Sequence, residues 1–248
     1  MRIYDTLIIG SGYTSLGYAA TASDTLIVEE RQICDTVFYL SLPTYSFDRA
    51  LPVAEEGRAF YKYYSDRGLF CGGMQDLNAF ESAFCAYALE NDIEILLKSR
   101  VINSTLTDGG IYEARVISPS GIITVCAKRI IDMRSREGKG SLTLLFSVRD
   151  KKSDVASLKT AFPGAIVEQA FYPDRYAVHV PTEDDYITAK KKAHALCHGI
   201  NGGARLIYTA PAIYLKRDEG GVPTDNAFSD PVSAFAAGVA YAKAVAQK

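Results

Sequence analysis

Residues 7–20, "LIIGSGYTSLGYAA", constrain the fold of this chain more than any other stretch. An apolar run rich in β-branched residues covers 6–9 and predicts a buried strand, which ends where Gly10 and Gly12 interrupt it. Small residues at helical spacing over 15–21 predict a helix that packs closely on a sheet. Residues 25–28 predict a second buried strand. Strand, glycine turn, helix and strand form a βαβ unit, which requires two parallel strands joined by a right-handed crossover.

The glycine turn has the spacing of a nucleotide-binding loop. Gly10, Gly12 and Ser15 occupy the three positions of G-x-G-x-x-G, with a serine as the small residue at the third. The glycines let the backbone approach a pyrophosphate, and the N-terminus of the following helix favours an anion. Glu29 ends the second strand, where its carboxylate can accept hydrogen bonds from a ribose diol. We therefore predict a dinucleotide loop, and the alternative is a strand-to-helix turn with a packing role only.

Length and charge exclude several classes of protein. The 248 residues suffice for one large domain or two small ones. A net charge of −2 provides neither a basic face for nucleic acid nor a polybasic membrane anchor. No apolar stretch reaches the roughly 18–20 residues of a membrane span, and the N-terminal apolar run is too short for a signal peptide. We expect a cytoplasmic protein whose partner is a small molecule, and the sequence does not predict its oligomeric state.

The middle of the chain predicts helices followed by an antiparallel meander. After an irregular, aromatic segment, residues 58–68 and 76–92 predict helices, and residues 93–107 predict a strand. The turns "DGG" and "PSG" then separate strands over 111–118 and 121–133. The end of the last strand, "RIIDM", can return to the main parallel sheet.

The last part of the chain has a different pattern. Residues 142–210 alternate strand, helix, strand, strand, helix and strand, which predicts a compact α+β unit. The chain closes with an alanine-rich helix over 230–248, with a proline in its first turn.

The order of these elements resembles the FAD-dependent oxidoreductases of the glutathione-reductase structural type. The phrases "IEILLKSRV" and "AKRIIDM" on either side of the meander carry the resemblance. It implies an α/β fold, in which residues 1–141 and 211–248 form a three-layer FAD/NAD(P)-binding domain of parallel sheet, helices and β-meander. Residues 142–210 would form a small α+β insertion domain. A nicotinamide dehydrogenase is disfavoured, because it would continue with further βα units instead of the meander.

The resemblance also implies an activity and a set of contact residues. The chain would be a flavin-dependent oxidoreductase that holds FAD non-covalently and acts on a small organic molecule in a cleft between the two domains. Within the implied set, the glycine loop faces the pyrophosphate, the acid after the second strand holds the ribose, and the segment 226–233 approaches the flavin ring. The full set of implied cofactor contacts is Gly10, Gly12, Tyr13, Thr14, Ser15, Glu29, Glu30, Arg31, Val101, Asp132, Asp225, Phe228 and Ser233.

Two phrases depart from the family pattern and support a rival interpretation. "IDMRS" stands where the family has "IDATG", and Thr224-Asp225 stands where it has "GD". The rival is a non-catalytic descendant of the fold that binds a nucleotide or a partner protein.

No catalytic residue is evident, and the weak candidate is His179. It lies in a predicted strand of the insertion domain, where it could exchange a proton with a substrate or be hydrogen-bonded within the sheet. His194 and His198 share a helix face but lack a third ligand, so we predict no metal site. Five cysteines without a short pairing motif argue against a disulfide framework, and Cys34 is interpreted as a small buried thiol.

The tyrosines between the first βαβ unit and the helix over 76–92 have two interpretations, which are packing in the core or covering one side of the flavin ring. They are Tyr39, Tyr45, Tyr61, Tyr63 and Tyr64.

Overall fold

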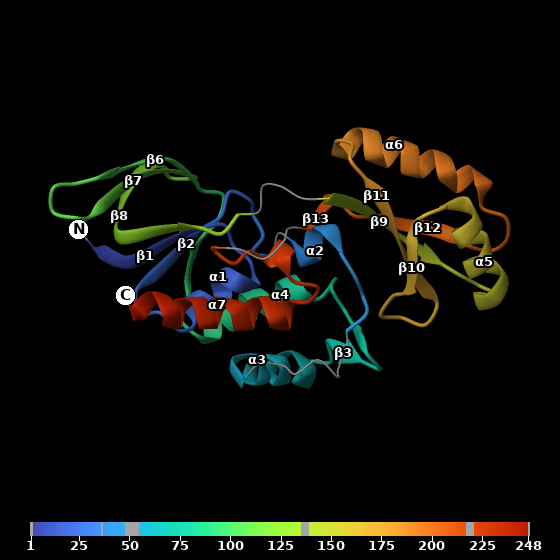
Figure 1. Cartoon of the computed structure of the whole chain (residues 1–248), viewed down its shortest axis with the longest axis horizontal. Helices are drawn as coiled ribbons and strands as arrows, with labels where there is room; N and C mark the ends of the chain where they lie inside the picture. Colours follow the sequence, from blue (N-terminus) through green and yellow to red (C-terminus); the bar gives the residue numbers. More distant parts are fainter. Residues whose placement is uncertain (1, 36, 48–54, 135–138, 217–220, 248) are drawn as a thin grey trace.

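The structure, a computed structural model, describes residues 2–35, 37–47, 55–134, 139–216 and 221–247. Two β-sheets make up its framework, and they lie next to each other along the long axis of the molecule (Figure 1). The larger sheet is built from the first part of the chain and the smaller from the second.

The larger sheet contains the predicted βαβ unit. Its strand order is β5-β2-β1-β8-β7-β6, and β5 (Glu94–Leu96), β2 (Thr25–Val28), β1 (Ile3–Ile9) and β8 (Gly121–Asp132) pair in parallel. Ile8 faces Ile27 on one side and Ile131 on the other. The parallel sheet that the sequence predicts is confirmed.

Strand β8 belongs both to the parallel part and to the meander. Its first half pairs antiparallel with β7 (Tyr112–Ser118), which pairs with β6 (Arg100–Leu106). Its second half runs parallel to β1, so that Asp132 lies beside Ile9 at the carboxyl end of both strands. The meander thus returns to the main sheet as predicted, next to the glycine loop.

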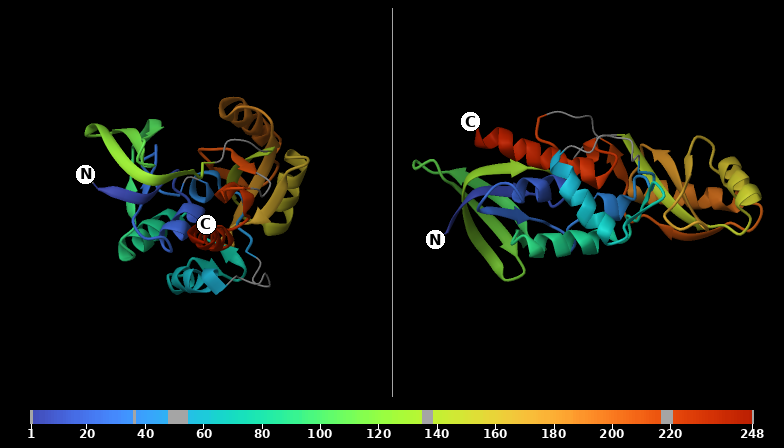
Figure 2. Two further views of the ribbon diagram at one scale, coloured as in Figure 1. Left: turned by 60° about the vertical axis from the view of Figure 1, so that its left-hand side comes forward. Right: turned by 90° about the horizontal axis from the view of Figure 1, so that it is seen from below.

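Helices cover one face of the parallel part of this sheet (Figures 1 and 2). Helix α1 (Tyr13–Ala19) packs against α7 (Pro231–Ala246) so closely that a Cβ on Gly238 would overlap the carbonyl oxygen of Thr14, and one on Gly17 would overlap that of Phe235. Glycine is required at both positions by space, since neither has a positive φ. The first and last helices of the chain therefore form one layer.

Aromatic residues fill the space between this layer and the segment that follows β2. That segment contains α2 (Phe38–Ser41), α3 (Glu55–Asp66), the hairpin β3 (Phe70–Cys71) and β4 (Met74–Gln75), and α4 (Phe80–Glu90). The Tyr13 ring is fully buried and meets the edges of surrounding rings at centroid distances of 5.1–6.2 Å. Tyr45 and Tyr64 are also buried in this cluster, while Tyr61 and Tyr63 are partly buried against it.

The smaller sheet is antiparallel and has helices on one face. It contains β9 (Lys139–Ser147), β10 (Ile166–Gln169), β11 (Arg175–Thr182), β12 (Arg205–Thr209) and β13 (Tyr214–Lys216). Helices α5 (Lys151–Ala161) and α6 (Tyr186–Leu196), with the short turn η1 (Cys197–Gly199), pack on one face. On the other face, Leu145, Ala177 and Ala210 join the aromatic core of the first part.

Two strands that the sequence presents as continuous are interrupted. The stretch 93–107 divides into β5 and β6, because Lys98 between them adopts a left-handed φ of 52°. The stretch 205–217 divides into β12 and β13, which both pair with β9. The strands of the smaller sheet run from Lys139 at the start of β9 to Lys216 at the end of β13. Among the described residues, no helix combines the length and the apolar character that crossing a membrane requires.

Candidate functional site

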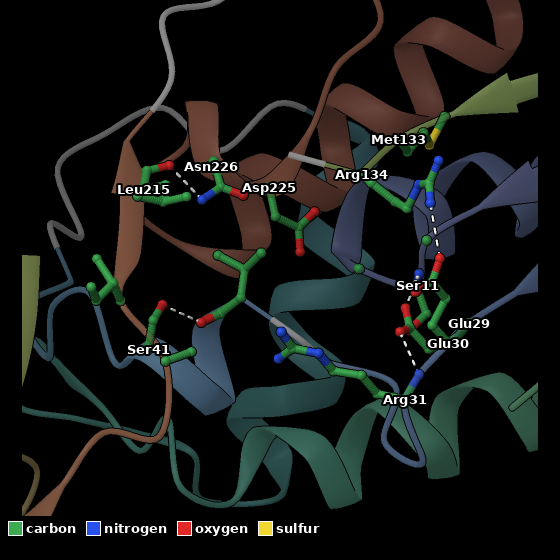
Figure 3. Close-up of a pocket in the computed structure, with 15 residues that line it drawn as sticks. Ser11, Glu29, Glu30, Arg31, Ser41, Met133, Arg134, Leu215, Asp225 and Asn226 are labelled. Atoms are coloured by element: carbon green, nitrogen blue, oxygen red, sulfur yellow. Dashed lines mark hydrogen bonds and ion pairs between the residues drawn. The ribbon is translucent and has the colours of Figure 1, made fainter. Parts of the chain in front are cut away.

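A cavity of about 360 Å³ lies where the glycine loop meets the chain around residues 212–215 (Figure 3). It is within the size range of small-molecule sites. Its walls come from the loop after β1, the residues after β2, the end of β8 and the short turn η2 (Asp225–Ala227). The lining residues are Gly10, Ser11, Gly12, Glu29, Glu30, Arg31, Val37, Ser41, Met133, Arg134, Ala212, Ile213, Leu215, Asp225 and Asn226.

The first glycine of the loop is required by its backbone conformation and by a neighbour. Gly10 has a φ of 99°, in the left-handed region that side chains avoid. A Cβ at this position would lie 2.7 Å from Cγ of Arg134. The side chain of Arg134 therefore lies directly over the glycine.

The N-terminus of α1 holds an anion that the chain itself supplies. The carboxylate of Asp225 accepts hydrogen bonds from the amides of Tyr13 (2.7 Å) and Thr14 (2.8 Å) and from the Thr14 hydroxyl (2.8 Å). A Cβ on Gly12 would lie 2.5 Å from Oδ2 of Asp225, so the second glycine makes room for this carboxylate. Burial raises the pKa of Asp225, and the three donors oppose that shift. Free N–H groups at a helix N-terminus attract an anion, and here the anion is a side chain.

A second carboxylate holds the first half of the loop. Glu29 accepts hydrogen bonds from the amide (2.8 Å) and hydroxyl (3.0 Å) of Ser11 and from the amide of Arg31 (2.9 Å). The amide of Gly12 donates to the Ser15 hydroxyl at 2.7 Å. The amide of Gly10 continues the strand by donating to a β2 carbonyl. Each amide from residue 10 to residue 14 thus donates to a protein oxygen.

Charged side chains form the rim of the cavity. The Arg134 guanidinium lies 2.9 Å from Asp132 and 3.0 Å from Glu30, and the hydrogen bond to Asp132 raises its pKa. The exposed side chain of Arg31 lies across the cavity in Figure 3. Its guanidinium makes no ion pair with the residues that the structure describes. The cavity therefore has one cation already paired with carboxylates and one available to an anionic ligand.

A buried acid that the sequence analysis missed lies next to this region. Asp35 is fully buried, its Oδ1 accepts the amide of Phe38 at 2.9 Å, and its Oδ2 has no hydrogen-bond partner among the described residues. Burial, and then the charge of Asp225, raise its pKa to about 8. The available signal was an aspartate shortly before a helix, because an Asp side chain readily accepts a backbone amide a few residues further along the chain.

Three of the implied cofactor contacts lie away from the cavity walls. Val101, on β6, is partly buried in the apolar cluster between sheet and meander, and Phe228 is partly buried against the aromatic core. The amide and hydroxyl of Ser233 donate to Asp230, the N-cap of α7, both at 2.8 Å. The remaining implied residues line the cavity, lie in the first turn of α1 or lie at the rim of the cavity. Ser135 of the "IDMRS" phrase is outside the described residues.

His179, on β11, lies in a buried polar network between the smaller sheet and the segment after α2. Its Nε2 is 2.9 Å from Oε1 of Glu168, and its Nδ1 is 2.9 Å from the Thr143 hydroxyl, which donates to the Leu42 carbonyl. Burial favours the neutral form of Glu168, but hydrogen bonds from His179, Ser46 and the Tyr45 amide outweigh it and hold its pKa at about 2. Thr143 and Glu168 thus hold the His179 ring through both of its nitrogens.

Hence His179 connects the smaller sheet to the segment after α2 and is not among the described residues that line the cavity. Of the predicted histidine pair, His194 lies on α6, 2.9 Å from the Thr209 hydroxyl, and His198 lies beyond the end of α6 in η1. The described residues contain no group of side chains with the composition of a metal site.

Comparison with known proteins gives matches in structure only. No protein-family model and no curated protein sequence matches the chain. A geranylgeranyl bacteriochlorophyll reductase-like protein of Thermoplasma acidophilum superposes with a TM-score of 0.62 at 14% identity, covering 100% of this chain and 79% of its own. The p-nitrophenol 4-monooxygenase of Pseudomonas putida gives 0.58 at 12% identity, covering 99% of this chain and 78% of its own.

An aklavinone-11 hydroxylase, solved with FAD and aklavinone, gives a TM-score of 0.55 at 14% identity over 99% of this chain and 63% of its own. Identities this low establish the fold alone. The structural matches, the strand order, the meander and the glycine loop together confirm the fold class that the sequence predicts. This chain has the fold of the FAD-binding flavoproteins, with a Rossmann-like sheet.

Proposed function

We propose that this protein is an FAD-dependent oxidoreductase that acts on a small organic molecule. The observation that carries the proposal is the anion held at the start of α1 beside a cavity. The carboxylate of Asp225 occupies the place that the loop offers to a pyrophosphate, and it stands in for two phosphate oxygens. The amides are therefore oriented to hold an anion.

The chain offers a hydrogen-bond acceptor for the ribose of a dinucleotide and a cation for its phosphate. Glu29 directly follows β2, and its carboxylate is fixed toward the loop. Its three hydrogen bonds leave room for a further donor, because a carboxylate has about four acceptor sites. Arg31 extends its guanidinium across the cavity, where it can pair with a phosphate (Figure 3). With these residues, the AMP half of FAD would lie along the loop after β2.

The roles of the chain and of the cofactor are separate. Bound FAD would supply the transfer of electrons or hydride, and the protein would bind, orient and shield it. The cavity extends from the loop to Ala212, Ile213 and Leu215, next to β13 of the smaller sheet. We place the substrate on this side, because it is where the two sheets border the cavity. The FAD complex of the aklavinone-11 hydroxylase, which shares the fold, supports FAD as the ligand.

A specific observation favours the rival, a non-catalytic descendant of the fold. The amides of residues 10–14 all donate to protein acceptors, and Arg134 covers Gly10. For FAD to bind with its pyrophosphate at α1, Asp225 has to leave the helix N-terminus. A chain in which Asp225 stays would keep the fold without the cofactor.

A comparison of FAD with FMN tests the proposal. FMN lacks the AMP half, so it cannot use Glu29, Arg31 or the loop in the proposed way. We expect FAD to bind the purified chain at least ten times more tightly than FMN in a fluorescence titration, and ADP to compete with it. Equal affinities for the two flavins would refute the assignment of the loop, and binding of neither would favour the non-catalytic descendant.

A further inference from the structure

Two cysteines that are far apart in the sequence meet behind the glycine loop. Cys34 lies between β2 and α2, Cys85 lies in α4, and their sulfur atoms are 3.7 Å apart across 51 residues of chain. Cys34 is 4% exposed, whereas Cys85 is partly exposed. A disulfide bond is about 2.05 Å long, so the sulfur atoms need to approach by less than 2 Å. We propose that Cys34 and Cys85 form a reversible intramolecular disulfide.

The surroundings assign different roles to the two thiols. The Cys85 thiol donates to Oε1 of Glu81 at 3.4 Å, and this carboxylate raises the pKa of Cys85. The contact between the two sulfur atoms outweighs the effects of burial and of Glu81 and lowers the pKa of Cys85. The same contact, followed by burial, raises the pKa of Cys34. Because the thiolate is the nucleophile in thiol–disulfide exchange, the partly exposed Cys85 attacks and the buried Cys34 resolves.

The reaction needs a low-molecular-weight disulfide as oxidant. The Cys85 thiolate attacks one sulfur of that disulfide and expels the first thiolate, giving a mixed disulfide at Cys85. Cys34 then loses its proton and attacks Sγ of Cys85, which releases the second thiolate. The two protein thiols give up two electrons and two protons, and the small disulfide becomes two thiols.

Through Cys34, the pair is linked to the candidate cofactor site. The hydroxyl of Ser11, in the glycine loop, donates to the carbonyl oxygen of Cys34 as well as to Glu29. Residues 29–41 carry Cys34 and also line the cavity through Glu29, Glu30, Arg31, Val37 and Ser41. A bond between Cys34 and Cys85 would thus tie one wall of the cavity to α4.

Thiol counting in glutathione buffers tests the proposal without any cofactor. The full chain is equilibrated with mixtures of reduced and oxidised glutathione, trapped with N-ethylmaleimide under denaturing conditions and analysed by mass spectrometry. We expect the thiols of Cys34 and Cys85 to be lost together in one step, both in the wild type and in C71S, the control without the exposed cysteine. The linked peptides should contain Cys34 and Cys85, and the protein should remain a single chain on a non-reducing gel.

Single variants test the two roles. In C34S, or in C34A if the serine is not tolerated, Cys85 should accumulate as a stable mixed disulfide with glutathione. In C85S, Cys34 should stay reduced in the folded protein. The proposal is overturned if the wild type keeps both thiols under conditions that modify Cys71, if its disulfides are intermolecular, or if Cys34 reacts equally well in C85S.

Discussion

At the scale of single residues, two buried acids determine the properties of the candidate site. Asp225 accepts hydrogen bonds from the first amides of α1, and its charge contributes to the raised pKa of Asp35. Both are withdrawn from water, and burial raises the pKa of both. Their effects can be separated by substitution, because one affects ligand affinity and the other affects the pH dependence of stability.

Replacing Asp225 with alanine should strengthen cofactor binding while weakening the apoprotein. The variant loses the hydrogen bonds to Tyr13 and Thr14, which should lower the free energy of unfolding by about 2 kcal/mol. It also removes the anion that competes with the pyrophosphate, so the affinity for FAD should rise about tenfold, or about 1.4 kcal/mol.

Asp154→Ala is the matched control, since Asp154 is a buried carboxylate that accepts backbone amides in the smaller unit. It should lose stability without a change in FAD affinity. A weaker affinity in Asp225→Ala, measured by isothermal titration, would mean that Asp225 contacts FAD directly.

Replacing Asp35 with asparagine should flatten the pH dependence of stability. The folded protein holds the Asp35 proton up to about pH 8, whereas the unfolded chain releases it near the ordinary value of 3.8. Between these values the native state binds more protons, so the free energy of unfolding falls by about 1.4 kcal/mol per pH unit as pH rises. In urea denaturation between pH 5 and 7, the free energy of unfolding of the variant should rise relative to that of the wild type at that rate. A constant difference would show that Asp35 is ionised in the folded protein.

At the scale of elements, the contact between α1 and α7 explains why two glycines lie within helices. A Cβ at Gly238 would overlap a backbone oxygen of α1, and backbone atoms cannot move away as a flexible side chain can. Gly238→Ala should therefore cost about 3 kcal/mol of stability in spite of the better helix propensity of alanine. Gly109→Ala is the control, because its Cβ would meet nothing closer than 3.8 Å. Equal melting temperatures for the two variants would contradict the close packing.

The elements themselves were largely predictable, and their junctions were not. The strand–turn–helix pattern around Gly10, the meander and the α+β unit follow from local periodicity and turn residues, which a sequence displays directly. The break at Lys98 depends on a left-handed residue that is not a glycine, and β13 exists because it pairs with β9. Neither feature is marked by the residues next to it in the sequence.

The glycine loop of the candidate site could be predicted from the sequence, whereas the side chains that contact this loop could not. The spacing of Gly10 and Gly12 indicates an anion-binding turn, but the sequence does not say that Asp225 would reach it from 212 residues away. His179 has the residue type of a catalytic group, yet its buried contact with Glu168 depends on the pairing of β10 with β11. Cys34 and Cys85 likewise meet only through the tertiary fold.

At the scale of the whole molecule, the two sheets are joined through buried contacts. Leu145 and Ala177 of the smaller sheet belong to the aromatic core of the larger part, and Glu168 binds Tyr45 and Ser46 across the junction. The cavity lies at the same junction, between the glycine loop and the chain beside β13. On the side of the glycine loop, Asp225 and Arg134 lie where a dinucleotide would have to enter the cavity.

The amount of flavin that the chain retains tests the central claim most directly. The purified chain is saturated with FAD, freed of unbound ligand by gel filtration and then denatured. The released molecule is identified by mass spectrometry and quantified by absorbance. The account predicts one intact FAD for each chain. A chain that emerges without flavin after saturation would contradict it.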